Sequence, residues 1–281
     1  MKKSGLQAFL LLLSLISFIF QSFSQSENFI QSYTLIKFFP DISFAKIVAD
    51  KLNKKINDIV TVKELANING DFDVGLDAEI SNLEGIGYLT GIDTFHCYKN
   101  EVTEIPAEIG NLVNLKYLDL NKAFALKKIP KEIGQLKNLI KIRISMTEIN
   151  SLPKEIGDLP KLETLTICCN RLSNIPKEIG HLKALKVLDI HSNNINKLPD
   201  EICNLTSLTS LNVSYCKLYN LPENIGDLKE LDSLNAFSND LKYLPKSIIH
   251  LNKLKYLNVF DNFKLSESFK TYLPILLKNK N

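Results

Sequence analysis

Cysteine and histidine are the residues of this sequence best suited to chemistry, and they come together at one place in its repeat pattern. Cys168 and His191 stand 23 residues apart, which is the period of a phrase that recurs along the chain. They therefore fall at the same position of two neighbouring units, and Cys169 lies beside them. Two thiolates and an imidazole could bind zinc, and a cysteine next to a histidine could serve as a nucleophile with its base.

Neither chemistry is expected at this position. Zinc needs three or four convergent ligands, and no further His, Asp or Glu falls in the same row of the repeat. A Cys–His nucleophile also needs a third group that orients the histidine, together with a cleft, and the sequence indicates neither. We therefore expect ordinary surface residues here, and we predict no catalytic residue, no cofactor-binding residue, no metal ligand and no cofactor.

The remaining motifs do not indicate catalysis either. Asp71–Gly75 has the aspartates of a calcium loop, but Leu76 stands where such a loop needs glycine, so a turn is the simpler interpretation. The sequence has no glycine-rich phosphate loop, no G-x-S-x-G elbow and no H-E-x-x-H motif. A separate catalytic domain, as in repeat-bearing ubiquitin ligases, would not fit after Leu265. We predict that the protein is not an enzyme.

The composition is that of a folded chain without a preference for nucleic acid. Of 281 residues, 45% are apolar and 23% charged, and 34 Lys and Arg against 31 Asp and Glu give a net charge of +3. The sequence has no Trp and no block of like charge, so we expect no nucleic-acid partner. The five cysteines are an odd number without paired spacing, which predicts free buried thiols.

The first residues have the pattern of a signal peptide. Lys2 and Lys3 precede the apolar stretch Phe9–Phe20, and Ser22 and Ser24 supply the small residues of a cleavage site. The alternative is a retained membrane anchor, but a run of about 12–15 residues is shorter than the ~20 that a spanning helix needs. We expect a secreted, extracellular or cell-surface associated protein without stable membrane insertion.

One phrase recurs from Ile105 onward. It joins P-x-E-I-G-x-L to the pattern L-x-x-L-x-L-x-x-N-x-L, as in Leu162–Leu172, with a period of 24 residues once and 23 residues five times. Periods of about 20–29 residues with this pattern are typical of leucine-rich repeats. The phrase opens at Ile105, Ile129, Leu152, Ile175, Leu198, Leu221 and Leu244.

The pattern predicts an α/β fold, a leucine-rich repeat solenoid in the form of a curved right-handed β-α superhelix. In each unit L-x-L is a short strand, and the proline begins a short helical segment. About seven apolar positions per unit stabilise it by roughly 2 kcal/mol each, while ordering each residue costs about 1.5 kcal/mol. A single unit is therefore unstable, and only stacking in a tandem array makes the fold stable.

The ninth position of the pattern predicts a row of buried asparagines that satisfy backbone groups of adjacent coils. Thr147 and Cys216 replace asparagine in two units, and the longer unit around Ala123–Leu126 predicts a local bulge. The row, called the asparagine ladder below, consists of Asn100, Asn170, Asn193, Asn239 and Asn262.

The segment before Ile105 predicts two helices, with Phe44 and Val48 on an apolar face of the first and a capping box at Thr61–Glu64 opening the second. Its F-P-D, V-T-x-x-x-L and L-x-G-I-x-Y-L-T motifs resemble the N-terminal cap and first repeat of internalin-like bacterial surface proteins. The P-x-E-I-G-x-L units are similar to the Ras-group type of leucine-rich repeat. We expect a signal peptide (1–24), a linker and small helical N-terminal cap (25–82), about eight repeats (83–264) and a C-terminal cap (265–281).

Exposed strand residues on the concave face would form the binding surface. Phe237, Phe260 and Phe263 have an alternative to exposure on this face, which is burial under the C-terminal cap. The row Asn212, Asn235 and Asn258 has an alternative to a solvated polar row, which is binding of a polar ligand such as a glycan. The residues that we predict to bind a protein are Tyr98, Tyr117, Arg143, His191, Tyr215, Phe237, Tyr256 and Phe260.

These features together predict a secreted, monomeric, non-enzymatic protein that binds a protein ligand through its concave face. The internalin-like resemblance implies adhesion or host-cell recognition with a cell-surface receptor as partner, although the C-terminus has no L-P-x-T-G sorting motif. The alternative function is binding of a glycan or cell-envelope polymer by the same face.

Overall fold

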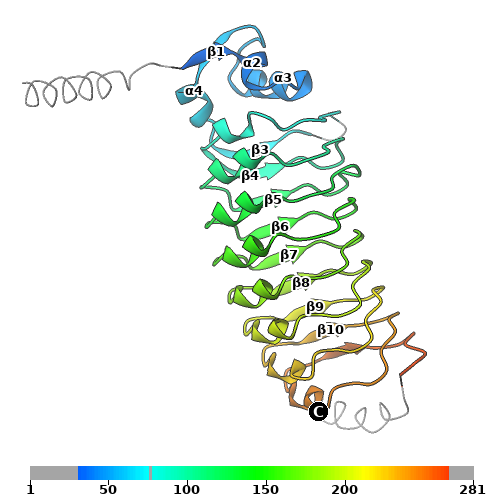
Figure 1. The fold of residues 1–281 in the computed structure, drawn as a ribbon. Coiled ribbons are helices and arrows are strands. Elements are labelled where there is room, and N and C mark those ends of the chain that lie inside the picture. Colours follow the sequence, from blue (N-terminus) through cyan, green and yellow to red (C-terminus); the bar gives the residue numbers. More distant parts are fainter. Residues whose placement is uncertain (1–30, 76–77, 266–281) are drawn as a thin grey trace, which may run out of the picture.

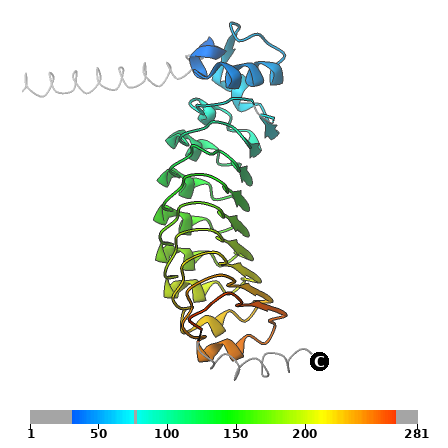
Figure 2. The ribbon, with the colours of Figure 1, turned by 90° about the vertical axis from the view of Figure 1, so that its right-hand side faces the viewer.

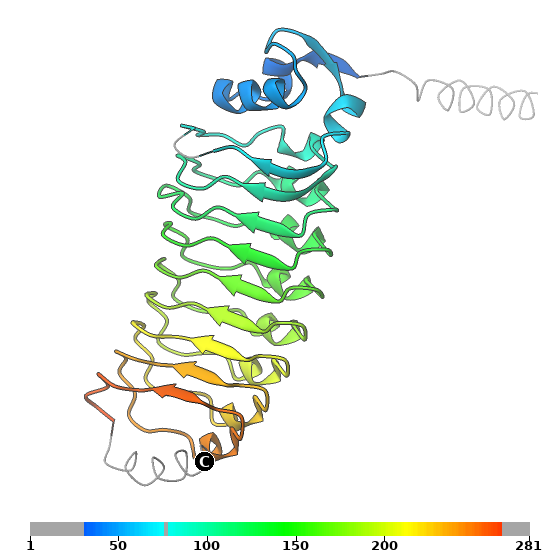
Figure 3. The same cartoon turned by 180° about the vertical axis from the view of Figure 1, so that it is seen from behind.

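Short parallel strands, one from each coil of the chain, form the main sheet. The computed structural model describes residues 31–75 and 78–265, and in this part of the chain nine strands pair strictly in sequence order, from β3 to β11. Figure 1 and Figure 3 show the resulting stack from its two broad sides. The strands are β3 (Gly70–Asp73), β4 (Ile92–His96), β5 (Tyr117–Asp119), β6 (Lys141–Arg143), β7 (Thr164–Thr166), β8 (Val187–Asp189), β9 (Ser210–Asn212), β10 (Ser233–Asn235) and β11 (Tyr256–Asn258).

The predicted leucine-rich repeat solenoid is confirmed, with one more strand than the expected eight. The additional strand is β3, which lies within the segment that we assigned to the N-terminal cap and pairs with β4 through a register shift between Gly70 and Asp71. The sheet therefore begins before the first recognisable repeat, because the cap itself supplies a strand that covers the edge of β4.

Short 3₁₀ helices line the side of the stack opposite to the strands. Figure 2 shows the strands along one margin of a curved stack and the helical turns along the other. Proline is the residue before the helix in six of these segments, such as Pro153 and Pro176, where its φ of −67° and −65° is the value that the ring imposes. The helices are η2 (Ile86–Tyr88), η3 (Ala107–Asn111), η4 (Lys131–Gln135), η5 (Lys154–Asp158), η6 (Lys177–His181), η7 (Asp200–Asn204), η8 (Ile225–Asp227) and η9 (Lys246–His250).

The glycine of the E-I-G phrase lets neighbouring coils approach each other closely. A Cβ atom added to Gly157 would collide with the backbone carbonyl of Glu178 in the next coil, and one added to Gly180 would collide with that of Glu201. A larger residue would force adjacent 3₁₀ helices apart and open the core between them. The repeated glycine is therefore explained by the spacing between coils.

The asparagine ladder forms as predicted. The Oδ1 atom of Asn193 accepts a hydrogen bond from the backbone N–H of Leu172 at 2.9 Å, and its Nδ2 donates to the carbonyl of Ile167 at 2.9 Å. Both partners belong to the preceding coil, so the amide joins two coils and satisfies buried backbone groups at the turn. Equivalent bonds to the preceding coil are made by Asn170, Asn239 and Asn262.

A residue in the left-handed conformation precedes each asparagine of the ladder and the equivalent residue of three other coils, Ala123, Thr147 and Cys216. In eight coils a non-glycine residue has a φ between 51° and 61° at this point. The left-handed region is unfavourable for such residues, so the buried hydrogen bonds and packing of the next residue must hold the turn. These residues are Lys99, Lys122, Met146, Cys169, Ser192, Tyr215, Ser238 and Asp261.

The units without a ladder asparagine use other contacts. The Thr147 hydroxyl donates to Oδ1 of Asn170 at 2.6 Å, and the Cys216 thiol donates to the carbonyl of Ile190 at 3.5 Å. In the longer unit the extra residue forms an additional turn, in which the N–H of Leu126 donates to the carbonyl of Ala123 at 2.9 Å. Pairing of β5 with β6 stays in register, so the predicted bulge lies in the loop rather than in the sheet.

A small helical unit covers the first coil. It consists of the antiparallel pair β1 (Ser32–Thr34) and β2 (Ile59–Thr61) with α2 (Leu35–Phe38), α3 (Ile42–Lys51) and α4 (Val62–Ala66). The predicted capping box is present at the start of α4, where Lys54 and the Thr61 backbone and hydroxyl groups lower the pKa of Glu64 to about 2. Edge-to-face aromatic contacts from Phe39 through Phe44 to Phe72 and Phe95 join this unit to the first two strands of the sheet.

Two of the predicted segments lie outside the described residues. The signal peptide (1–24) falls entirely there, and so does the C-terminal cap except for Leu265. Within the described ranges, no helix is long and apolar enough to cross a membrane.

The ladder makes a first testable prediction. Asn193→Ala removes the partners of buried backbone groups in Leu172 and Ile167, so we expect the free energy of unfolding to fall by about 1–3 kcal/mol. The matched variant Asn194→Ala changes an exposed neighbour and should shift the free energy of unfolding by no more than about 0.5 kcal/mol. Urea denaturation followed by far-ultraviolet circular dichroism measures both. Equal losses in the two variants would contradict the role assigned to the ladder.

Candidate functional site

The concave face of the stack, called the inner face below, carries the side chains that alternate with the buried strand residues. On β8, for example, Leu188 is fully buried, whereas Val187 and Asp189 are half-exposed. Because the strands from β4 to β11 share one register, equivalent residues form rows across this face. The eight predicted binding residues lie along the rows in three separate groups, and they do not converge on one site.

The first group lies at the N-terminal end of the inner face, in a polar hollow of about 540 Å³. Tyr98 and Arg143 both line it, and the Arg143 guanidinium lies 3.6 Å from the carboxylate of Asp119. The ammonium of Lys122 lies 5.3 Å from the centre of the Tyr98 ring. Charges of both signs therefore surround the hollow, while Tyr117 stands on β5, 40% exposed.

The second group is an aromatic patch at the C-terminal end. The rings of Tyr215 and Phe237 meet edge to face with their centres 5.2 Å apart. Tyr215, Tyr256 and Phe260 are 56%, 49% and 72% exposed, respectively, whereas Phe237 is half-buried against its neighbour. Phe263 is also exposed. The alternative of burial under a C-terminal cap involves residues after Leu265, which lie outside the described part of the chain.

The asparagine row of the inner face uses its acceptor atoms within the protein. The Oδ1 atoms of Asn235 and Asn258 accept hydrogen bonds at 3.2 Å from the backbone N–H groups of Phe237 and Phe260. Asn212 accepts in the same way from Ser214. These amides therefore support the turn after each strand, and they offer a ligand less hydrogen-bonding capacity than the sequence suggested.

The third group surrounds His191 in the middle of the face. Cys168, Cys169 and His191 each offer a ligand atom, and these atoms lie within 4.8 Å of one another. The Sγ atom of Cys169 lies 3.6 Å from Nε2 of His191, while Asp189 Oδ1 lies 2.7 Å from Nδ1 of the same ring. The expectation that no third group orients this histidine is therefore wrong.

Asp189 was missed because the rows of the repeat were considered one at a time. Asp189 and His191 are two residues apart at the end of β8, and in an extended segment such residues point to the same face. That spacing was visible in the sequence and could have identified the pair.

The other thiols belong to the interior. Cys97, Cys203 and Cys216 are part of the continuous hydrophobic core, and Cys168 is buried as well. The expectation of free buried cysteines is therefore confirmed for these four and is wrong for Cys169, which is half-buried. Burial raises the pKa of Cys97 and of Cys203 to about 12. Burial also raises the pKa of Cys168 and of Cys216 to about 11, so these four groups are protonated thiols at neutral pH.

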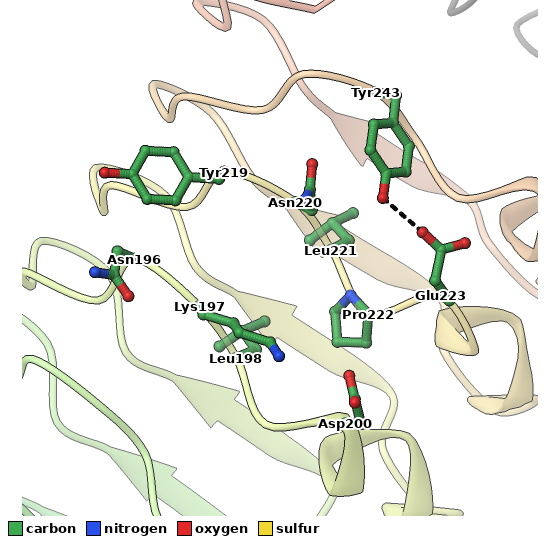
Figure 4. Close-up of a pocket in the computed structure, with 10 residues that line it drawn as sticks. All are labelled: Asn196, Lys197, Leu198, Asp200, Tyr219, Asn220, Leu221, Pro222, Glu223 and Tyr243. Carbon is green, nitrogen blue, oxygen red and sulfur yellow. Dashed lines mark hydrogen bonds between the residues drawn. The ribbon is translucent and has the colours of Figure 1, made fainter.

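A further pocket lies away from the inner face, on the loops that lead from the strands to the 3₁₀ helices. Its volume is about 310 Å³, and Figure 4 shows Tyr219, Asn220 and Tyr243 around it, with the Tyr243 hydroxyl donating to Glu223 at 2.7 Å. Oδ1 of Asn220 is buried, and among the described residues it has no hydrogen-bond partner. No pattern in the sequence indicates this pocket, because its residues come from the variable loop positions of the repeat.

Two family models match the chain within the stacked coils. One, described as a leucine rich repeat, matches residues 160–218, and the other, described as a leucine-rich repeat region, matches residues 92–174. Together with the nine-stranded parallel sheet, these matches identify the fold of the stacked coils as a leucine-rich repeat solenoid. Comparison with the curated proteins gives no match.

Several solved structures have a similar fold. A leucine-rich repeat protein of Leptospira interrogans is 28% identical with a TM-score of 0.51, and the match covers 71% of this chain and 62% of that one. Internalin C2 of Listeria monocytogenes is 22% identical with a TM-score of 0.68, over 83% of this chain and 99% of the internalin. A third similar structure is the ectodomain of the Arabidopsis thaliana receptor kinase GASSHO1/SCHENGEN3, solved in complex with CASPARIAN STRIP INTEGRITY FACTOR 2. It is 20% identical with a TM-score of 0.52, and the match covers 62% of this chain and 30% of the ectodomain.

The burial of the thiols predicts the order in which they react. Cys169 is the one cysteine that is not buried, so iodoacetamide should modify it first in the folded protein. Cys97 and Cys203 should become reactive only in denaturant, because burial keeps them protonated and inaccessible. Peptide mass spectrometry after timed labelling measures the order. Rapid labelling of Cys97 in the native protein would contradict the packing described above.

Proposed function

We propose that the protein acts outside the cell by binding a protein ligand through the inner face of its solenoid. The observation that carries the proposal is the aromatic patch, in which Tyr215, Tyr256 and Phe260 are exposed and the half-buried Phe237 packs against Tyr215. Aromatic side chains that stand exposed in one patch are where binding energy concentrates in protein interfaces. A solenoid does not need them there, because its stability comes from the core between the coils.

The size of the inner face supports a macromolecular ligand. Nine strands at about 4.8 Å spacing span about 38 Å. A face of this length, with its flanking loops, approaches the ~800 Å² per partner that a standard protein interface buries. The charged hollow around Arg143 at one end and the aromatic patch at the other could then contact the same partner, the first giving orientation and the second affinity.

The finer features of the proposal rest on resemblance. The signal-peptide pattern and the internalin-like cap motifs support secretion, and the fold shared with internalin C2 and with a plant receptor kinase ectodomain is consistent with an extracellular role. On this basis we propose adhesion or host-cell recognition with a cell-surface receptor as partner, a Ras-group type of repeat, and a monomeric protein. The division into signal peptide, N-terminal cap, repeats and C-terminal cap is part of the same proposal.

Binding of a glycan or cell-envelope polymer has weaker support. It would rely on the row Asn212, Asn235 and Asn258, whose acceptor atoms are already bonded to the turns that follow the strands. The aromatic patch, by contrast, has exposed ring surface that remains available. The inner face therefore favours a protein ligand.

Paired phenylalanine variants test the proposal. The protein is first used to capture biotin-labelled surface proteins from candidate target cells, and the affinity for a captured protein is then measured by surface plasmon resonance. We expect the double variant Phe237→Ala/Phe260→Ala to weaken binding at least about tenfold, since anchoring aromatics contribute about 2 kcal/mol or more. The melting temperature should change little, because Phe260 is exposed and Phe237 is half-buried.

The chain supplies a matched control. Phe124 is exposed to an extent comparable with Phe260, but it lies in the loop after β5, outside the sheet. Phe124→Ala should therefore leave the affinity unchanged. Equal affinity of the double variant and wild type would overturn the assignment of the patch. Glycan-array binding that survives the double variant but is lost in Asn212→Ala and Asn235→Ala would favour the alternative function instead.

A further inference from the structure

The cluster of Cys168, Cys169 and His191 has the composition of a soft-metal site. Residues two positions beyond the paired Thr166 of β7 and Asp189 of β8 are Cys168 and His191, so the register of the sheet brings them side by side. The turn after β7 adds Cys169, and one ligand atom from each of the three residues lies within 4.8 Å of the others. Two sulfurs and one imidazole nitrogen are ligands that Zn²⁺ prefers.

Two neighbours hold the His191 ring so that its Nε2 atom faces the thiols. Asp189 Oδ1 lies 2.7 Å from Nδ1, and because a carboxylate only accepts hydrogen bonds, this contact needs a proton on Nδ1; the amide Nδ2 of Asn212 lies 3.3 Å from the same atom. Nε2 lies 3.6 Å from the sulfur of Cys169, where the neutral ring can coordinate a metal. A carboxylate that holds a histidine in this way is the usual outer partner of a zinc-bound imidazole.

Cys168 lies at the margin of the hydrophobic core, next to a polar group. Cys168 is buried, yet it does not belong to the continuous hydrophobic core that includes Cys97, Cys203 and Cys216. Its sulfur lies 3.1 Å from the hydroxyl of Ser145 on the neighbouring coil. In the metal-free protein the Cys168 thiol donates to this hydroxyl; once the thiol has lost its proton to become a metal ligand, the hydroxyl can donate to the thiolate instead and serve as a second outer partner.

We propose that Cys168, Cys169 and His191 bind a single Zn²⁺ ion in the middle of the inner face, with Asp189 as a positioning residue. On binding, the two thiols lose their protons to solvent and the sulfurs coordinate the ion as thiolates, while His191 coordinates through Nε2. The three protein ligands leave a fourth position of a tetrahedral ion open to water. The ion would join the coils of β7 and β8, and it lies between the charged hollow and the aromatic patch.

Titration of the reduced, metal-free full chain tests the site. With Zn²⁺ alone as the probe, isothermal titration calorimetry should give one ion per chain. With Co²⁺ in its place, the spectrum should show thiolate-to-cobalt charge transfer and the intense visible bands of tetrahedral coordination. Zn²⁺ should also raise the melting temperature of the wild type, because an ion that binds only the folded state stabilises it.

Substitutions of single side chains distinguish the three proposed metal ligands from residues outside the site. Cys169→Ser and His191→Gln should abolish the zinc-dependent rise in melting temperature, whereas Cys203→Ser in the core and His181→Gln on η6 should keep it. Asp189→Asn should weaken zinc binding about 10- to 100-fold while retaining the cobalt charge-transfer band, as expected for a residue that acts through His191. The melting temperatures of the metal-free variants report whether each one folds.

Two results would overturn the proposal. One is zinc binding by Cys169→Ser and His191→Gln with wild-type affinity. The other is a cobalt spectrum of the wild type without a thiolate charge-transfer band. Both are independent of any protein partner, so failure of the metal site would leave the proposed binding function untouched.

Discussion

No single coil of this protein can bury its own leucines or satisfy all the backbone groups of its own turn, and every coil therefore depends on its neighbour. The dependence is most direct at the asparagine ladder, where one amide bonds backbone groups of the preceding coil while the residue before it is held in the left-handed conformation. The glycine of each 3₁₀ segment adds a steric requirement, since the adjoining coil leaves no room for a side chain. Coil spacing, strand register and curvature all follow from these contacts between neighbours.

The same constraint creates the inner face. Because stacking fixes the strands in register, residues at equivalent positions are brought together in rows whatever their chemistry, and the repeat can vary them without loss of stability. This freedom explains how a charged hollow, a Cys–Cys–His cluster and an aromatic patch occur along one sheet. Function in such a protein depends on which side chains are placed in the rows, and the fold alone does not determine it.

Much of the fold could be predicted from the sequence because it is periodic. The repeat length, the ladder positions and the capping box at Thr61 are local patterns with one physical interpretation each, and all were found where expected. The strand β3 could not be predicted, because it lacks the repeat pattern and forms only by pairing with β4. The orientation of His191 by Asp189 and the pocket around Asn220 were missed, since both depend on side chains whose positions become neighbours only after the coils stack.

The packed fold buries one set of aromatic side chains and leaves the inner face open to a ligand. Hydroxyl-radical footprinting of the native protein, read by mass spectrometry, measures the accessibility of both sets at once. We expect rapid modification of Tyr215, Tyr256 and Phe260 and strong protection of Phe44 and Phe95, which are fully buried. Protection of the inner-face residues to the level of Phe44 would mean that the chain covers this face itself, and it would contradict the account.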